Sequence, residues 1–199
     1  HEPSGAQHEP LADLIRRTAR RGGSVLIPAF AVDRTEVVLQ TLTGLRHAGR
    51  IPDLPVFVNS PMALAALGVY TSARYAAELR PDLDAGSFVD LPGLREVHST
   101  EESIKLNNPK VPCIIISSSG MATGGRVLHH LEHMLPDDRH AVVLAGYQAE
   151  GTRGRLLLEG VQHLKMHGRN VPVRAEILQD EEFSVHADGS DLIDWLRDL

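Results

Sequence analysis

The residues with the clearest chemical potential lie in SSSGMATGGR, at positions 117–126, directly after an apolar, β-branched run. This order predicts a strand, a tight loop and a helix N-terminus. Backbone N–H groups at a helix start have no intrahelical partner, and the helix dipole adds partial positive charge there. Glycines let the backbone come close to an anion. The loop therefore predicts a site for a phosphate or another polar ligand, although a purely structural strand-to-helix turn uses the same residue types.

The candidate anion contacts of this loop are Ser118, Ser119, Gly120, Met121, Gly124, Gly125 and Arg126. The loop is not a Walker loop, because GxxxxGK[ST] is absent. Its GMATGG spacing also differs from the dinucleotide fingerprint GxGxxG.

A second candidate lies in GYQAEGTRGRLL, residues 146–157, where Gly151 and Thr152 stand at a predicted helix start. Their N–H groups can face an anion, or they can simply begin a capped surface helix. Four arginines at or near strand-end turns, each of which could also be a solvated surface residue, are candidates for a local basic lining: Arg34, Arg126, Arg153 and Arg155.

The third candidate is His186 in FSVHAD, a polar break between a predicted strand and a helix. A histidine there can act as a general acid or a metal neighbour near neutral pH, although a lone histidine is more often not catalytic. His129 and His133 are four apart on a predicted helix, a spacing that can hold zinc. Without a third ligand, such a pair more often lies on a solvated helix face.

These residues are positioned by strands that alternate with helices. Helices are expected at 9–21, 33–47, 61–79, 99–106, 125–135, 151–160 and 188–198, and strands at 24–29, 55–58, 113–117, 140–145 and 171–178. Asp33 and Glu36 have capping-box spacing, and residues 80–98 read as irregular. The pattern predicts an α/β fold with a mainly parallel sheet between two helical layers, a three-layer α/β/α arrangement. Ligands bind such sheets at the carboxyl ends of the strands.

Composition limits the partners. The 199 residues carry a net charge of -6, so no global basic field attracts a polyanion, which must instead bind in a local groove. The single cysteine, Cys113, excludes an internal disulfide and suits a cytoplasmic protein. No apolar run is long enough to span a bilayer and no signal-peptide pattern is present, so no membrane association is expected. Because the chain starts at His1 rather than Met, we expect its natural N-terminus to lie upstream.

Five segments occur in the order seen in the β-CASP branch of the metallo-β-lactamase superfamily, which the chain resembles over nearly its whole length. They are PAFAVDRTEVVL, NSPMA, SSSGMATGGRVLHHL, GYQAEGTRGRLL and FSVHAD. The resemblance implies a cassette inserted in a metallo-β-lactamase domain, with a cleft that holds two zinc ions and hydrolyses RNA, closest to the bacterial RNA-processing exonucleases. It implies that His186 is the motif-B histidine and assists at the scissile phosphate. It further implies that the loop at 117–125 and the turn at Gly151 hold RNA backbone.

The departures from this family are equally informative. The zinc motif HxHxDH is absent, and so are the acidic residue of motif A and the histidine of motif C. We therefore expect residues 1–178 to form the cassette and residues 179–199 to start the return into the metallo-β-lactamase domain. This chain alone is expected to bind no catalytic zinc and to cleave no RNA. Its expected partners are RNA and the parent's metallo-β-lactamase domain, with a homodimer left open.

Two further features of the sequence depart from this family. Asn59 stands where the resemblance implies aspartate. Three carboxylates, Asp180, Glu181 and Glu182, come directly before FSVHAD, where they would repel RNA unless they point away or bind metal.

One alternative function is a non-catalytic homologue that acts as an RNA or protein scaffold. The other is an unrelated doubly wound domain that binds a nucleotide or sugar phosphate.

Overall fold

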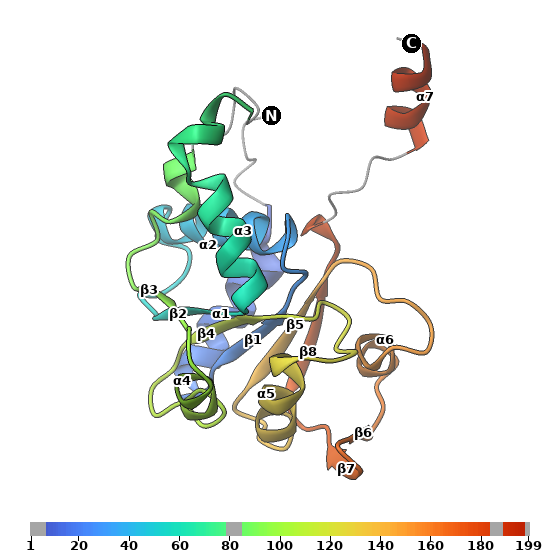
Figure 1. Cartoon of the computed structure of the whole chain (residues 1–199). Coiled ribbons are helices and arrows are strands. Elements are labelled where there is room, and N and C mark those ends of the chain that lie inside the picture. Colours follow the sequence, from blue (N-terminus) through green and yellow to red (C-terminus); the bar gives the residue numbers. More distant parts are fainter. Residues whose placement is uncertain (1–6, 79–84, 184–188, 198–199) are drawn as a thin grey trace.

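The structure is a computed structural model that describes residues 7–78, 85–183 and 189–197. Its centre is a six-stranded, fully parallel sheet in the order β3-β2-β4-β1-β5-β8 (Figure 1). The strands are β1 Val25–Pro28, β2 Val56–Asn59, β3 Leu94–Glu96, β4 Ile114–Ser117, β5 Ala141–Ala145 and β8 Glu176–Asp180. A separate antiparallel hairpin pairs β6 His163–Met166 with β7 Arg169–Pro172.

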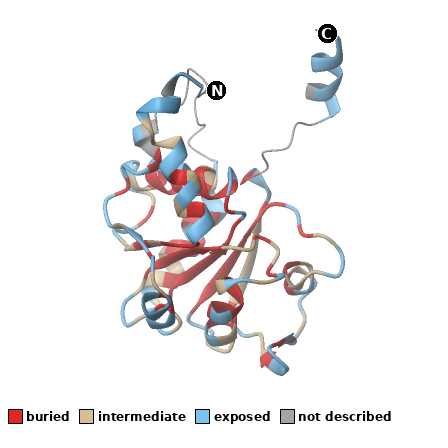
Figure 2. Cartoon of the chain, in the orientation of Figure 1, coloured by how far each residue is buried: buried red, intermediate tan, exposed pale blue. Residues whose placement is uncertain are grey.

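The central strands form because their apolar runs bury both faces of the sheet. Every residue of β1, β4 and β5 is buried, and Figure 2 shows the buried residues concentrated on this sheet. Alternate residues enter two different cores: Ile114 and Ile116 face one, and Ile115 faces the other. Each fully buried aliphatic side chain contributes about 1.5–3 kcal/mol to folding.

Helices cover both faces of the sheet, as predicted. One core takes side chains from α1 Glu9–Arg20, α2 Arg34–His47 and α3 Pro61–Tyr70. The other takes side chains from α5 Arg126–Met134 and α6 Arg153–Leu158, with the C-cap of α4 Thr100–Lys105 at its edge. The remaining helical elements are η1 Ala73–Glu78, η2 Ala85–Phe88, η3 Glu181–Phe183 and α7 Gly189–Arg197. The α/β fold with three layers is thereby confirmed.

Two predicted elements were wrong in extent. Residues 171–178 are not one strand: the alternating pattern there joins the end of β7 to the start of β8, which belong to different sheets. The alanine-rich helix expected over 61–79 ends at Tyr70, and a separate 3₁₀ helix follows at Ala73–Glu78. Helical periodicity did not reveal this break, because the segment has no glycine or proline after Gly68. Strand β8 also runs across position 178, and a domain boundary there stays a prediction.

The predicted capping box at Asp33 was also wrong. Asp33 has a left-handed φ of 63° and makes no side-chain cap, and its carboxylate instead accepts a hydrogen bond from the Tyr70 hydroxyl. That contact, the largest cause, raises the pKa of Tyr70 to about 12. A capping box does form at Ser99 and Glu102, at the start of α4.

The last helix, α7, has an exposed apolar side. The large apolar side chains of α7 are exposed, namely Leu192, Ile193, Trp195 and Leu196. In Figure 1, α7 lies away from the sheet, and no described element covers this side of the helix. Within the described residues, no helix combines the length and apolar character needed to cross a membrane.

Candidate functional site

Three turns at the carboxyl ends of the strands join into one surface. Gln148 Nε2 donates to the carbonyl oxygen of Gly120 at 3.3 Å, and the N–H of Gly154 donates to the carbonyl oxygen of Met121 at 3.1 Å. Gly120 also packs against Phe30, because a Cβ added to it would lie 2.9 Å from the Phe30 ring. The turns that follow β1, β4 and β5 are therefore in contact, as the position of ligand sites in parallel sheets predicts.

This surface contains a pocket of about 200 Å³. The residues that line it come from these three strand ends: Phe30, Val32, Asp33, Arg34, Met121, Ala145 and Tyr147. Phe30 and Tyr147 are large apolar side chains that remain exposed, at 45 % and 65 %. The pocket thus combines exposed aromatic rings with an arginine.

Arg34 is the unusual member of this pocket. Its side chain is buried, and both Nε and Nη1 lack a hydrogen-bond partner among the described residues. Burial lowers the pKa of the Arg34 guanidinium, and the neighbouring Asp33 charge opposes that shift only in part. Gly146, with a φ of 97°, lets the backbone pass this group, since a Cβ there would lie 3.0 Å from Nη1. A buried guanidinium without a partner is costly, and a bound anion would satisfy it.

The serines of the loop after β4 are engaged within the protein. The Ser118 hydroxyl donates to the Ser60 hydroxyl at 2.9 Å. The Ser119 hydroxyl accepts from the N–H groups of Thr123 and Gly124, at 3.0 and 3.3 Å. These contacts satisfy two backbone N–H groups that an anion would otherwise use. The loop therefore holds its own shape, and it forms one wall of the pocket through Met121.

The two glycine turns have left-handed backbone. Gly125 has a φ of 81°, and a Cβ there would lie 2.8 Å from the Ser118 carbonyl oxygen. Gly151 has a φ of 76°, with open space around it. Thr152 caps α6, because its hydroxyl accepts from the N–H of Arg155 at 3.2 Å. Glycine is needed at position 125 for both conformation and space, and at position 151 for conformation alone.

The remaining arginines of the expected basic lining already have protein partners. Arg153 Nε donates to the carbonyl oxygen of Lys165 at 3.0 Å. Arg155 pairs with Glu159 at 2.7 Å, one helical turn away. Arg34 alone among the four predicted arginines has buried guanidinium nitrogens without a partner in the described chain.

Arg126 is held at the start of α5 by a buried polar network. Its Nη1 donates to Asn59 Oδ1 at 2.8 Å and lies 3.3 Å from the carbonyl oxygen of Val97. The Asn59 amide nitrogen contacts Ser103 Oγ at 2.8 Å and His130 Nε2 at 2.6 Å. Burial is the main reason that the pKa of His130 falls to about 4. Sequence reasoning missed His130, although its place four residues after Arg126 on one helix gave a signal.

Two carboxylates of the acidic run before FSVHAD contact His8. His8 Nδ1 lies 2.9 Å from Asp180 Oδ2, and the His8 N–H donates to Glu182 Oε2 at 3.0 Å. The His8 ring also packs against Phe183, with centroids 4.6 Å apart. These contacts join the start of the described chain to the end of β8. His186 lies outside the described residues.

Two groups of three side chains could hold a metal ion within the described residues: His8, Asp180 and Glu182, and His129, Glu132 and His167. Neither contains a residue of an HxHxDH motif, which the sequence lacks. Three donors in each group do not make the ligand set of a two-zinc centre. The described residues therefore do not fit such a centre by themselves.

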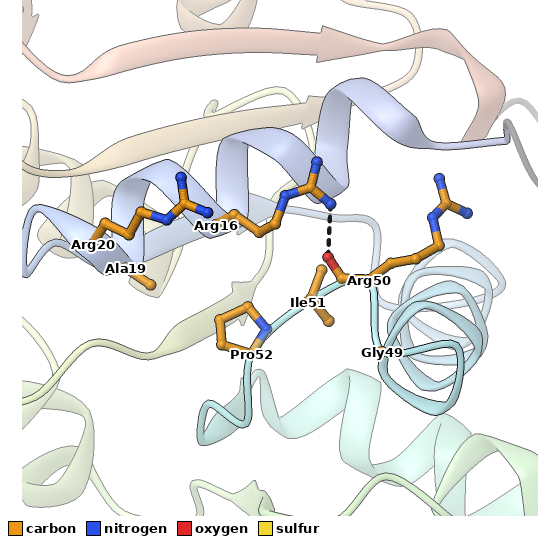
Figure 3. Close-up of a pocket in the computed structure, with 7 residues that line it drawn as sticks. All are labelled: Arg16, Ala19, Arg20, Gly49, Arg50, Ile51 and Pro52. Atoms are coloured by element: carbon orange, nitrogen blue, oxygen red, sulfur yellow. Dashed lines mark hydrogen bonds between the residues drawn. The ribbon is translucent and has the colours of Figure 1, made fainter.

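A larger pocket, of about 400 Å³, lies elsewhere in the fold (Figure 3). Its lining residues are Arg16, Ala19, Arg20, Gly49, Arg50, Ile51 and Pro52. Glu9 pairs with Arg16 at 2.7 Å and with Arg50 at 2.6 Å, and Arg16 also donates to the Arg50 carbonyl oxygen at 2.8 Å. Arg16 and Arg50 thus have protein partners, whereas the strand-end pocket contains the unpaired nitrogens of Arg34, which makes it the stronger candidate for an anion site.

Two protein family models match this chain. The β-CASP domain family model matches residues 35–157, which is more than half of the chain. A Zn-dependent metallo-hydrolase RNA specificity domain model matches residues 170–199. The chain belongs to the β-CASP family.

Curated relatives agree with this assignment. The chain is 36 % identical to Ribonuclease TTHA0252 of Thermus thermophilus, over 99 % of this chain and 46 % of that protein. It is 33 % identical to an RNase J-like protein of Methanocaldococcus jannaschii, over 95 % of this chain and 43 % of that protein. It is 34 % identical to the transcription termination factor FttA of the same organism, over 95 % of this chain and 31 % of that protein. The chain thus spans less than half the length of these relatives.

Proposed function

We propose that this chain forms the RNA-binding wall of the cleft in a zinc-dependent β-CASP ribonuclease. The observation that carries the proposal is the buried Arg34 guanidinium, whose Nε and Nη1 have no protein partner beside the strand-end pocket. A backbone phosphate supplies the acceptor oxygens that this cation lacks, because a guanidinium forms charge-assisted bonds with phosphate. The RNA specificity domain match and the ribonuclease relatives support RNA as the polyanion.

The remaining pocket residues take simple roles in this proposal. Phe30 and Tyr147 are exposed at the pocket and offer faces on which a base can stack. The loop residues from Ser118 to Gly125 shape the wall, and Arg126, fixed by Asn59, adds positive charge beside it. Gly151 and Thr152 extend the wall at α6. Stacking and phosphate contact carry little base specificity, so we expect weak sequence preference.

The chemistry requires more than this chain. Zinc ions held by a metallo-β-lactamase domain would activate water in the complete enzyme. We propose that His186 assists at the scissile phosphate by protonating the leaving oxygen, and that the chain alone does not hydrolyse RNA. End-labelled RNA incubated with the chain and its His186→Ala variant should remain equally intact. Cleavage of the RNA by the chain alone would contradict its proposed inactivity.

The binding role is tested by replacing Arg34 with methionine, which keeps much of the volume and removes the charge. We expect RNA affinity, measured by fluorescence anisotropy with a short single-stranded oligonucleotide, to fall about tenfold or more. We also expect the free energy of unfolding to rise by about 1–3 kcal/mol, because a buried group without a partner is removed. Arg155→Gln is the matched control, since Arg155 is already paired with Glu159, and it should change affinity less than about twofold.

The two measurements separate binding from structure. If Arg34 is purely structural, its replacement should lower the stability of the protein and leave RNA binding by the folded fraction unchanged. That result would contradict the proposal.

Family membership sets aside the alternative of an unrelated nucleotide-binding domain. A non-catalytic scaffold role predicts the same RNA binding but no zinc-dependent cleavage by the complete protein. A cytoplasmic location and a homodimer stay predictions.

A further inference from the structure

A group of donor side chains that the RNA-binding role does not use lies where α5 meets the β6–β7 hairpin. His129 and Glu132 belong to α5, and His167 lies in the turn of the hairpin. One ligand atom from each side chain can be chosen so that all three lie within 4.8 Å of one another. His167 follows Glu132 by 35 positions, so the tertiary fold brings the group together.

Direct contacts hold the members of the group together. His167 Nδ1 lies 2.9 Å from Glu132 Oε2. The imidazole rings of His129 and His167 are stacked, with centroids 4.7 Å apart. Arg169 contacts the other carboxylate oxygen, Oε1, at 3.4 Å. Oε2 therefore faces the His167 imidazole while Oε1 faces Arg169.

Donor chemistry and spacing both suit a transition metal. Imidazole nitrogens with a carboxylate oxygen are a common zinc ligand set, with metal–ligand bonds of about 2.0–2.2 Å. Such bonds in a tetrahedron place ligand atoms about 3.3–3.5 Å apart. From separations of up to 4.8 Å, the group needs a contraction of up to about 1.5 Å, which exposed histidine side chains can supply by rotation.

We propose that His129, Glu132 and His167 form a surface site for a divalent transition metal such as Zn²⁺, with water in the fourth position. Two imidazoles favour zinc, nickel or copper over magnesium or calcium. The bound ion would link the hairpin to α5. The pair suggested by sequence spacing alone, His129 with His133, is not this site, because His133 Nδ1 instead lies 2.8 Å from the carbonyl oxygen of His129.

Calorimetric titration of the EDTA-treated, dialysed chain with ZnCl₂ tests the site. We expect saturable binding that weakens about tenfold or more in each of His129→Gln, Glu132→Gln and His167→Asn. Asparagine suits position 167, because His167 has a φ of 46° and asparagine tolerates left-handed backbone. His163→Gln is the matched control: this exposed histidine lies on β6 of the same hairpin outside the group, and its variant should bind as the original chain does.

Two further readouts locate the ion. Co²⁺ in the site should give visible absorption bands typical of tetrahedral N/O ligation, and these should disappear in His167→Asn. Zinc should raise the melting temperature of the original chain but not that of the three ligand variants, since an ion that binds only the folded state stabilises it. The proposal is overturned if the chain shows no saturable zinc binding. It is equally overturned if His167→Asn retains binding or if Asp180→Asn, in the other donor group, is the variant that abolishes it.

Discussion

Arg126 Nη1 donates to Asn59 Oδ1 over 2.8 Å, which ties the first residue of α5 to the last residue of β2. The amide nitrogen of Asn59 continues the chain of contacts to His130 Nε2, one helical turn further along α5. Because an amide nitrogen only donates, Nε2 must accept, and the imidazole proton is assigned to Nδ1. Nδ1 is buried and has no hydrogen-bond partner within the described part of the chain. The asparagine therefore fixes both the position of Arg126 and a neutral His130.

Replacing Asn59 with aspartate should raise the pKa of His130 well above its value of about 4. A carboxylate beside Nε2 favours the protonated imidazolium, whereas the present amide does not. An NMR titration of the His130 ring measures the change. Ser103→Ala removes the other contact of the Asn59 amide without adding charge, and it should leave the titration close to its original position. An unchanged pKa in Asn59→Asp would contradict the contact described here.

Glu36 and His130 should give opposing pH dependences of stability. Burial raises the pKa of Glu36 from 4.5 to about 7, so the folded state holds a proton that the unfolded state releases, and stability falls as pH rises through this window. The pKa of His130 falls from 6.5 to about 4, so the unfolded state binds the extra proton, and stability rises with pH between these values. The two effects cancel in large part between about pH 4.5 and 6.5.

Glu36→Gln should therefore expose the His130 effect. Urea unfolding of this variant should show stability that rises between about pH 4 and 6.5 by up to about 3 kcal/mol, while the original chain changes much less. Above pH 7 the variant should no longer lose stability to ionisation at position 36. If the stability of the two proteins changes with pH in the same way, the raised pKa of Glu36 is contradicted.

Gly120→Ala should destabilise the protein by about 1–3 kcal/mol. The added Cβ would lie 2.9 Å from the Phe30 ring and 3.0 Å from the Phe30 backbone nitrogen, so the turns after β1 and β4 must separate. Gly44→Ala is the control, because open space surrounds that position within α2 and alanine should stabilise the helix by about 1 kcal/mol. Thermal unfolding compares the two. Equal effects of both substitutions would contradict the close contact of the turns.

Much of this fold follows from local sequence, because continuous apolar runs such as Ile114–Ser117 encode buried strands and the segments between them encode helices. The strand-end position of the loop after β4 follows from the same pattern. What local sequence does not encode is partner choice: Arg153 and Arg155 resemble Arg34 in the sequence, yet they find protein acceptors and Arg34 does not. The donor group at His167 likewise depends on a tertiary contact across 35 positions.

The salt dependence of RNA binding tests the central claim most directly. Single-stranded RNA affinity falls with salt on a logarithmic slope of about -0.7 per phosphate neutralised. If Arg34 holds one backbone phosphate, the Arg34→Met slope should be smaller in magnitude than that of the original chain by about 0.7. The Arg155→Gln slope should stay unchanged. Identical slopes for the original chain and Arg34→Met would show that this buried guanidinium contacts no phosphate.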